Sequence, residues 1–300
     1  MPGFGGYSAL GVAEIVVAAC LTLLPLLVVG FWGEWVVRQS EKLPTWVRVV
    51  RPAALCLPYV LVSSAAGMFR WLWLLVYALL PVVVAALMLY GKRVDPMQRG
   101  TWRELLVLAA LGLAVDLRWL ERAWPPHLAA FNKMLLLDVG ICGLLVLREL
   151  DGVGFDLRLR LRDFAVGARE YLFYAPVAVA FGLGLGFLHF HAHWPSVLQA
   201  VGAMVFTFLF IAIPEELFFR GWVQNLLERR VGRMPALLVT AVLFGLAHFN
   251  KRAVHFNWRY VVMAALAGVF YGRAWRQQRR VGASAVTHAL VDATWSLWLR

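Results

Sequence analysis

Residues 211–222 read IAIPEELFFRGW, and three ionisable side chains, Glu215, Glu216 and Arg220, lie within this apolar stretch. A charged side chain at the centre of a bilayer-spanning helix costs about 2.5–3.5 kcal/mol, so such residues are first considered as functional candidates. On a helix Glu216 and Arg220 share a face, which predicts a charge-assisted ion pair. Glu215 points about 100° away from Glu216. We therefore expect Arg220 to neutralise Glu216 and Glu215 to remain available as a base.

Two later segments contribute further candidates. The basic turn RRVGR follows Glu215 by about as many residues as separate this turn from His248 in VLFGLAHFN. If both arms are helices that rise 1.5 Å per residue, the hairpin returns His248 to the depth of Glu215. The last apolar stretch, VGASAVTHALVDATWSLWL, places His288 and Asp292 four residues apart on one helix face.

The six candidates thus come from three predicted helices. Polar side chains within membrane spans often hydrogen-bond one helix to the next, and this structural role stays open for each candidate. Their matching depth and helical spacing nevertheless favour a functional site over six separate structural contacts.

The three segments resemble the motifs of a known family. Glu-Glu-x-x-x-Arg (215–220), Phe-x-x-x-His (244–248) and His-x-x-x-Asp (288–292) occur in the order found in the CPBP superfamily of type II CAAX prenyl endopeptidases and Abi-type glutamic intramembrane proteases. The resemblance covers about residues 165–300. It implies that Glu215 activates water, that His248 helps to hold this water, and that His288 polarises the scissile carbonyl or protonates the leaving amine. The third motif often ends in Asn, so Asp292 is a departure: it is either protonated or has another role, such as orienting His288.

A metal centre is the rival interpretation of the same side chains. His248, His288 and Glu215 could bind Zn²⁺ and leave one position for water. The chain has no His-Glu-x-x-His motif, and the glutamate pair already supplies a base. We therefore favour hydrolysis without a cofactor and keep a divalent metal as the alternative.

The composition predicts the architecture that must position these residues. The 300 residues are 62% hydrophobic and 15% charged, with a mean hydropathy of +0.71, which is far from the composition of soluble domains. Several runs approach the ~20 apolar residues that cross a bilayer. We predict an all-α, polytopic transmembrane bundle with eight to ten spans, near residues 9–32, 52–69, 71–90, 105–120, 134–147, 171–190, 198–213, 235–250, 259–275 and 282–299.

The chain changes character near residue 150, which predicts three parts. Residues 1–150 form N-terminal membrane helices without an assigned role, and residues 171–300 form the catalytic membrane bundle. Between them, residues 151–170 alternate apolar and charged positions, which favours a cytoplasmic interfacial segment on anionic lipids. A short edge strand or a partner-binding element is the alternative.

The net charge of +12 does not indicate a nucleic-acid partner. Most Lys and Arg residues lie in every second connection between predicted spans, which is the positive-inside pattern of membrane proteins. The three cysteines lie in apolar runs without metal-like spacing, so neither a disulfide framework nor a cysteine metal site is predicted.

The sequence thus predicts a multi-pass intramembrane endopeptidase, in a bacterial inner membrane, that cleaves a membrane-anchored peptide or protein. Two other function classes stay open. One is a non-proteolytic membrane partner or immunity protein on the same scaffold. The other is a proton-coupled transporter in which buried Glu, His and Asp form a relay.

Overall fold

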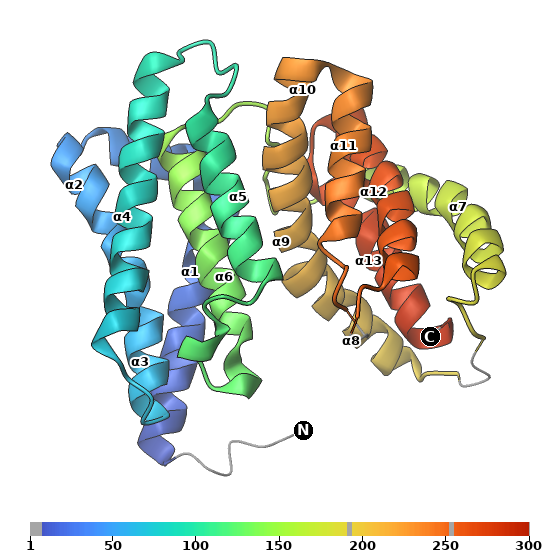
Figure 1. Cartoon of the computed structure of the whole chain (residues 1–300), viewed down its shortest axis with the longest axis horizontal. Helices are drawn as coiled ribbons and strands as arrows, with labels where there is room; N and C mark the ends of the chain where they lie inside the picture. Colours follow the sequence, from blue (N-terminus) through green and yellow to red (C-terminus); the bar gives the residue numbers. More distant parts are fainter. Residues whose placement is uncertain (1–7, 191–193, 252–254, 300) are drawn as a thin grey trace. The chain divides into compact units, whose positions relative to one another are not determined.

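A computed structural model describes residues 8–190, 194–251 and 255–299, and in these residues the secondary structure is helical, without strands. The predicted all-α fold is therefore confirmed. The chain divides into two compact units, residues 1–150 and 151–300, and Figure 1 colours their helices along the sequence.

The first unit is built from long apolar helices with short connections. Its elements are α1 (Ala9–Glu41), α2 (Thr45–Val50), the 3₁₀ helix η1 (Arg51–Cys56), α3 (Leu57–Ala65), α4 (Trp71–Val94), α5 (Trp102–Asp116), the 3₁₀ turns η2 (Glu121–Ala123) and η3 (Pro126–Leu128), α6 (Ala130–Gly140) and the π-helix η4 (Ile141–Leu147).

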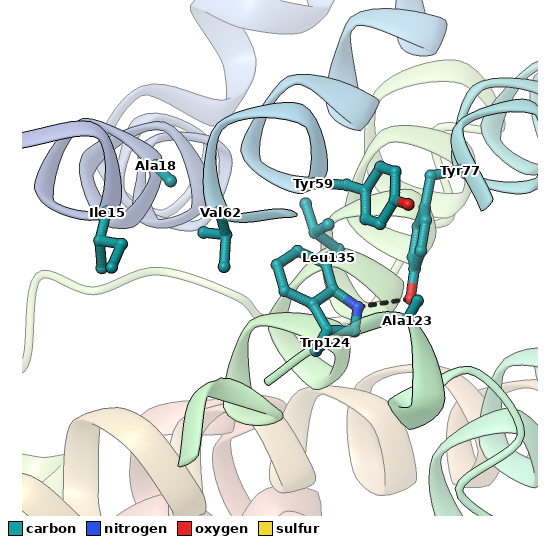
Figure 2. Close-up of a cluster of buried hydrophobic side chains, with 8 residues drawn as sticks. All are labelled: Ile15, Ala18, Tyr59, Val62, Tyr77, Ala123, Trp124 and Leu135. Carbon is teal, nitrogen blue, oxygen red and sulfur yellow. Dashed lines mark hydrogen bonds between the residues drawn. The ribbon is translucent and has the colours of Figure 1, made fainter. Parts of the chain in front are cut away.

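A cluster of buried side chains, several of them aromatic, forms part of the core of this unit (Figure 2). The indole Nε1 of Trp124 donates a hydrogen bond of 2.6 Å to the hydroxyl of Tyr77, which donates in turn to Asn132 Oδ1 at 2.7 Å. Tyr59 stacks on Tyr77 with ring centroids 5.2 Å apart. The polar tips of Trp124 and Tyr77 thus have partners, as burial away from water requires.

The second unit holds the candidate residues. Its elements are α7 (Leu161–Gly184), α8 (Val197–Thr207), the π-helix η5 (Phe208–Ala212), α9 (Ile213–Glu216), the π-helix η6 (Leu217–Gln224), α10 (Asn225–Val231), α11 (Arg233–Leu246), α12 (Trp258–Gln278) and α13 (Val281–Trp298). Helix α12 packs against α11, α13 and α7, as Figure 1 shows.

Among the described residues, five helical stretches are long and apolar enough to cross a membrane. They are Leu10–Glu41, Thr45–Ala65, Trp71–Val94, Pro126–Leu147 and Val197–Val231. This is fewer than the eight to ten predicted spans, although the other predicted spans also fold as helices. Helices α5 and α11 have only 15 and 14 residues, whereas α7, α12 and α13 carry charged or small residues in place of a continuous apolar surface.

Residues 151–160 run along the second unit without regular structure, and α7 begins at Leu161. The edge-strand alternative for this segment is therefore wrong. The segment is tied to the start of α13: the amide of Val281 donates to the carbonyl of Gly154 at 2.9 Å, and Trp275 Nε1 donates to the carbonyl of Val153 at 3.0 Å. Its placement at a lipid interface stays a prediction.

The charged residues of this segment fix the same helix end. Arg280, the residue before α13, donates to Asp163 at 2.9 Å and to Asp156 at 3.1 Å. Both acids belong to the segment or to the first turn of α7. The start of α13, and with it the depth of His288 two turns later, is thus set by contacts made well before it in the sequence.

Candidate active site

One helical hairpin carries the two glutamates and His248. The stretch from α8 to α10 is a continuous helix, interrupted by the π-helices η5 and η6 on either side of α9. Pro214 lies in the first turn of α9, where its missing N–H removes an α-helical hydrogen bond. Gly232, with φ of +81°, then makes the sharp turn from α10 to α11. The predicted loop at RRVGR is therefore confirmed.

The ion pair predicted within the hairpin is present. Arg220 donates from Nη1 to Glu216 Oε1 at 2.9 Å, and both side chains are completely buried. Arg220 also donates from Nη2 to the carbonyl of Gly268 on α12 at 3.0 Å. Its guanidinium lies 4.6 Å from the ring centroid of Phe244 and 5.2 Å from that of Tyr271. These contacts offset part of the cost of burying two charges, although Arg220 Nε and Glu216 Oε2 have no hydrogen-bond partner among the described residues.

His288 joins the ion pair to the last helix. Its Nδ1 lies 2.8 Å from Glu216 Oε1, so Glu216 receives both the arginine and the imidazole on one oxygen. The imidazole Nε2 lies 3.5 Å from Asp292 Oδ2 and 3.9 Å from Glu215 Oε2. The ring of His288 stacks on Tyr271 with centroids 4.6 Å apart. Three carboxylates thus surround one buried imidazole.

Glu215 differs from Glu216 in its surroundings. Its side chain is 27% exposed, and it lies 4.0 Å from Lys251 and 3.9 Å from His288. These separations exceed a direct hydrogen bond and are compatible with a bridging water. The two adjacent glutamates therefore occupy a buried ionic network and a more open position, respectively.

His248 follows α11 and has a defined tautomer when neutral. Its Nδ1 lies 2.8 Å from the carbonyl of Phe244, which only accepts, so Nδ1 carries the hydrogen and Nε2 is an acceptor. The ring stacks on Tyr260 with centroids 5.2 Å apart. The four-residue spacing of Phe244 and His248 thus lets the imidazole donate a hydrogen bond to the Phe244 carbonyl.

The structure brings all six sequence candidates into one cluster. Phe244 lies at its centre, with its ring 4.8 Å from His248 and 5.6 Å from His288, as measured between centroids. The contact between Glu216 and His288 was not predicted, because helical spacing within one segment says nothing about which face meets another helix.

Sequence reasoning missed Tyr271, Tyr260 and Lys251. Tyr271 supports both His288 and Arg220, and it continues the face of α12 that carries Ala264, Ala267 and Gly268. In the sequence, Tyr271 could have been found as a tyrosine at helical spacing from the small residues of the same helix face. Lys251 follows His248 by three residues, and it lies in the polar sequence Asn-Lys-Arg, which gave no signal of a site.

A metal site in this cluster has little support from the side-chain arrangement. Among the described residues, no three His, Cys, Asp or Glu side chains are placed to hold a metal ion together. His248 Nε2 is chemically able to bind a metal, but His288 has its Nδ1 on Glu216 and its Nε2 directed at Asp292 and Glu215. The residues present suit an ionic network better than a ligand set.

A cavity of about 120 Å³ opens beside the cluster. His248, His288 and Asp292 line it, and the remaining walls are mostly apolar and aromatic residues of α7, α12 and α13. An apolar cavity with a few convergent polar groups is the usual form of a binding site.

Residues 197–294 match the family model described as Rce1-like type II CAAX prenyl endopeptidase. The match runs from the start of α8 into α13 and includes all six candidates, so the family resemblance seen in the motifs is confirmed over this part of the chain. Comparison with curated proteins and with solved structures gives no match. The five apolar helices together with this match identify an integral membrane protein.

Proposed function

We propose that this protein is an intramembrane endopeptidase that hydrolyses a peptide bond in a membrane-anchored peptide or protein, in a bacterial inner membrane. The observation that supports it best is the buried His288 held among Glu215, Glu216 and Asp292 at the wall of an apolar cavity. The match to the Rce1-like family model supports the protease class.

Glu215 is the general base in this proposal. Arg220 and His288 already contact Glu216 Oε1, so the carboxylate of Glu216 is less suited to take a proton from water. Glu215 is more exposed, with 27% of its side chain accessible, so a water molecule can reach its carboxylate. Glu215 takes one proton from this water as the oxygen attacks the scissile carbonyl carbon and the carbonyl oxygen becomes an oxyanion. The oxyanion then re-forms the carbonyl, the C–N bond breaks, and Glu215 returns the proton to the leaving amine nitrogen.

His248 positions the same water. Because its Nδ1–H is used by the Phe244 carbonyl, its Nε2 accepts a hydrogen bond from water. Stacking on Tyr260 fixes the plane of the ring. A held water and a fixed base together supply orientation, which lowers the entropic part of the barrier.

His288 stabilises the developing oxyanion. Its Nδ1 lies 2.8 Å from Glu216 Oε1, and its Nε2 faces Asp292 at 3.5 Å and Glu215 at 3.9 Å, so three carboxylates favour the cationic imidazolium. Such a cation at a buried site favours the negative charge that forms on the carbonyl oxygen. Asp292 orients the ring in this proposal, which gives a role to the residue that departs from the usual Asn.

The decisive experiment compares Glu215→Gln with Glu216→Gln. Both variants are inserted in membranes and tested on a membrane protein whose processing changes when the gene is deleted. We expect Glu215→Gln to lower the cleavage rate by about 10²- to 10⁴-fold, as for the loss of a general base, with unchanged thermal unfolding. Glu216→Gln should instead destabilise the fold. Equal and mild effects of the two substitutions would contradict this division of roles.

The same variants separate the two alternative functions. A non-proteolytic partner or immunity protein would keep its activity in Glu215→Gln, since no water is activated. A divalent metal is tested by treating the purified protein with a chelator and measuring its metal content. Cleavage that is lost on chelation and restored by Zn²⁺ would replace the metal-free mechanism.

Proton-coupled transport has one observation in its favour. Asp138 of α6 is completely buried, and neither of its carboxylate oxygens has a hydrogen-bond partner among the described residues. Buried acids in membrane spans are typical of proton relays. Asp138→Asn should abolish proton flux in a transporter but leave peptide cleavage unchanged in a protease whose base is Glu215.

A further inference from the structure

The cavity beside the cluster has two kinds of wall. His248, His288 and Asp292 form its polar side, and the tyrosines 171, 174, 260 and 271 surround it. Elsewhere its walls are mostly apolar, and they include Ala175, Ala178, Met263, Ala264 and Ala267. A group that enters the cavity therefore meets mostly apolar walls while it touches His248 and His288, two of the residues proposed to act on the peptide bond.

Four alanines make the space. Ala175 and Ala178 are three residues apart on α7, and Ala264 and Ala267 have the same spacing on α12. Residues three apart lie on one helix face, so each helix presents a pair of small side chains to the cavity. A larger residue at these positions would occupy the volume that is now open.

The size of the cavity limits what it can hold. Its volume is about 120 Å³, whereas an apolar protein cavity of about 150 Å³ is sufficient for one benzene molecule. Sites for drug-sized ligands are larger, from about 300 Å³ upwards. The space thus suits one branched aliphatic or aromatic side chain, and it is too small to enclose a long lipid chain.

We propose that the cavity is a specificity subsite for one large apolar side chain of the substrate, of the size of Leu, Met or Phe, on a residue next to the scissile bond. This inference rests on the proposed peptidase function. Ala178 and Ala264 are then specificity-determining residues, because their small size sets the volume that the substrate side chain fills.

The first test measures cleavage preference. Palmitoylated peptides with randomised positions are incubated with the protein in lipid vesicles, and the products are sequenced by mass spectrometry. We expect Leu, Met and Phe to be enriched at one position next to the cut. Ala178→Leu or Ala264→Leu should lower kcat/KM for these peptides by about 10- to 200-fold, the range for a misfit of one methylene, with little loss for an Ala peptide.

Two further variants serve as controls for this test. Ala180→Leu, on the exposed side of α7 two residues from Ala178, should leave the preference unchanged. Met263→Ala enlarges the cavity and should shift the preference towards Trp, so the proposal stays testable even if the leucine variants fold poorly. Cleavage with no dependence on side-chain size in any variant would overturn the subsite while leaving the peptidase in place.

A second test does not depend on catalysis. In a chain whose three native cysteines are replaced by serine, Ala178→Cys is treated with benzyl methanethiosulfonate, which attaches a benzyl group by a disulfide bond. We expect labelling of Cys at this position, and at least a tenfold slower reaction when Ala264→Leu is added. Equal rates in both backgrounds would show that the cavity does not accept the benzyl group and would overturn the subsite. Labelling without cleavage of any peptide would instead overturn the proposed function.

Discussion

At the scale of single residues, the main feature is that adjacent glutamates have different surroundings. Glu216 Oε1 accepts from Arg220 and His288, whereas Glu215 lies beside His288 and Lys251 at about 4 Å. Removal of one partner of a buried ion pair leaves a charge without compensation, and this usually destabilises a protein more than the intact pair stabilises it.

Arg220→Gln should therefore lower the free energy of unfolding by about 3–5 kcal/mol. The double variant with Glu216→Gln should recover part of this loss, because it also removes the orphaned carboxylate. Thermal unfolding in detergent, followed by circular dichroism, measures both effects. A double variant that is no more stable than Arg220→Gln would show that the buried charge of Glu216 is compensated by other groups.

Asp292 supplies a second prediction at this scale. If its role is to accept a hydrogen bond from His288, Asp292→Asn keeps an acceptor oxygen and should lower kcat by less than about tenfold. Asp292→Leu lacks an acceptor and should lower kcat by about 10²-fold or more, the range of a lost positioning or electrostatic contact. Equal losses in both variants would mean that the negative charge itself is needed.

At the scale of the elements, close helix contacts determine where the candidates lie. A Cβ added at Gly245 of α11 would come within 2.5 Å of the carbonyl oxygen of Val261 and 2.8 Å of Ala265 Cβ on α12. Only glycine allows this approach, and His248 follows three residues later. The α11–α12 contact thus positions His248.

Gly245→Ala should separate these helices and lower stability by about 1–3 kcal/mol, as overpacking does, together with a loss of cleavage. Gly202→Ala on α8 is the matched control, because nothing lies within 4 Å of the added Cβ. This control should be neutral or slightly stabilising. Normal activity and stability of Gly245→Ala would contradict the positioning role of this contact.

The attachment of α13 gives another prediction for an element. Asp163 is buried and accepts from Arg280 and from the backbone amide of Arg160, whereas Asp156 is 30% exposed. Asp163→Asn should cost about 1.5–3 kcal/mol, the range for a hydrogen bond to a charged group. Asp156→Asn should cost at most about 1 kcal/mol, as for a surface ion pair. Chemical denaturation of the two variants in detergent tests this order.

At the scale of the whole molecule, five apolar helices make membrane insertion the main physical constraint. Burial of several such spans in the bilayer should keep the protein in the membrane pellet after extraction with alkaline carbonate, and detergent should release it. Release by carbonate would contradict the integral membrane assignment. The comparison uses the full chain with a peripheral membrane protein as the control.

The sequence by itself determined the helical fold, the membrane character and the ion pair of Glu216 with Arg220. These features depend on composition and on the 3.6-residue repeat, which are local properties of the chain. The turn at Gly232 could also be predicted, because a basic, glycine-containing segment separates two apolar runs. Not every predicted span is strongly apolar, since helices that pack on other helices, such as α13, need not be apolar on every side.

Only the tertiary structure decided how the helices meet. It placed His288 on Glu216, brought Tyr271 beneath His288 and Arg220, and tied residues 151–160 to the start of α13. It also opened a cavity where four alanines of α7 and α12 face one another. These contacts join residues far apart in the chain, and they depend on the rotation and crossing of whole helices, which no spacing within one segment determines.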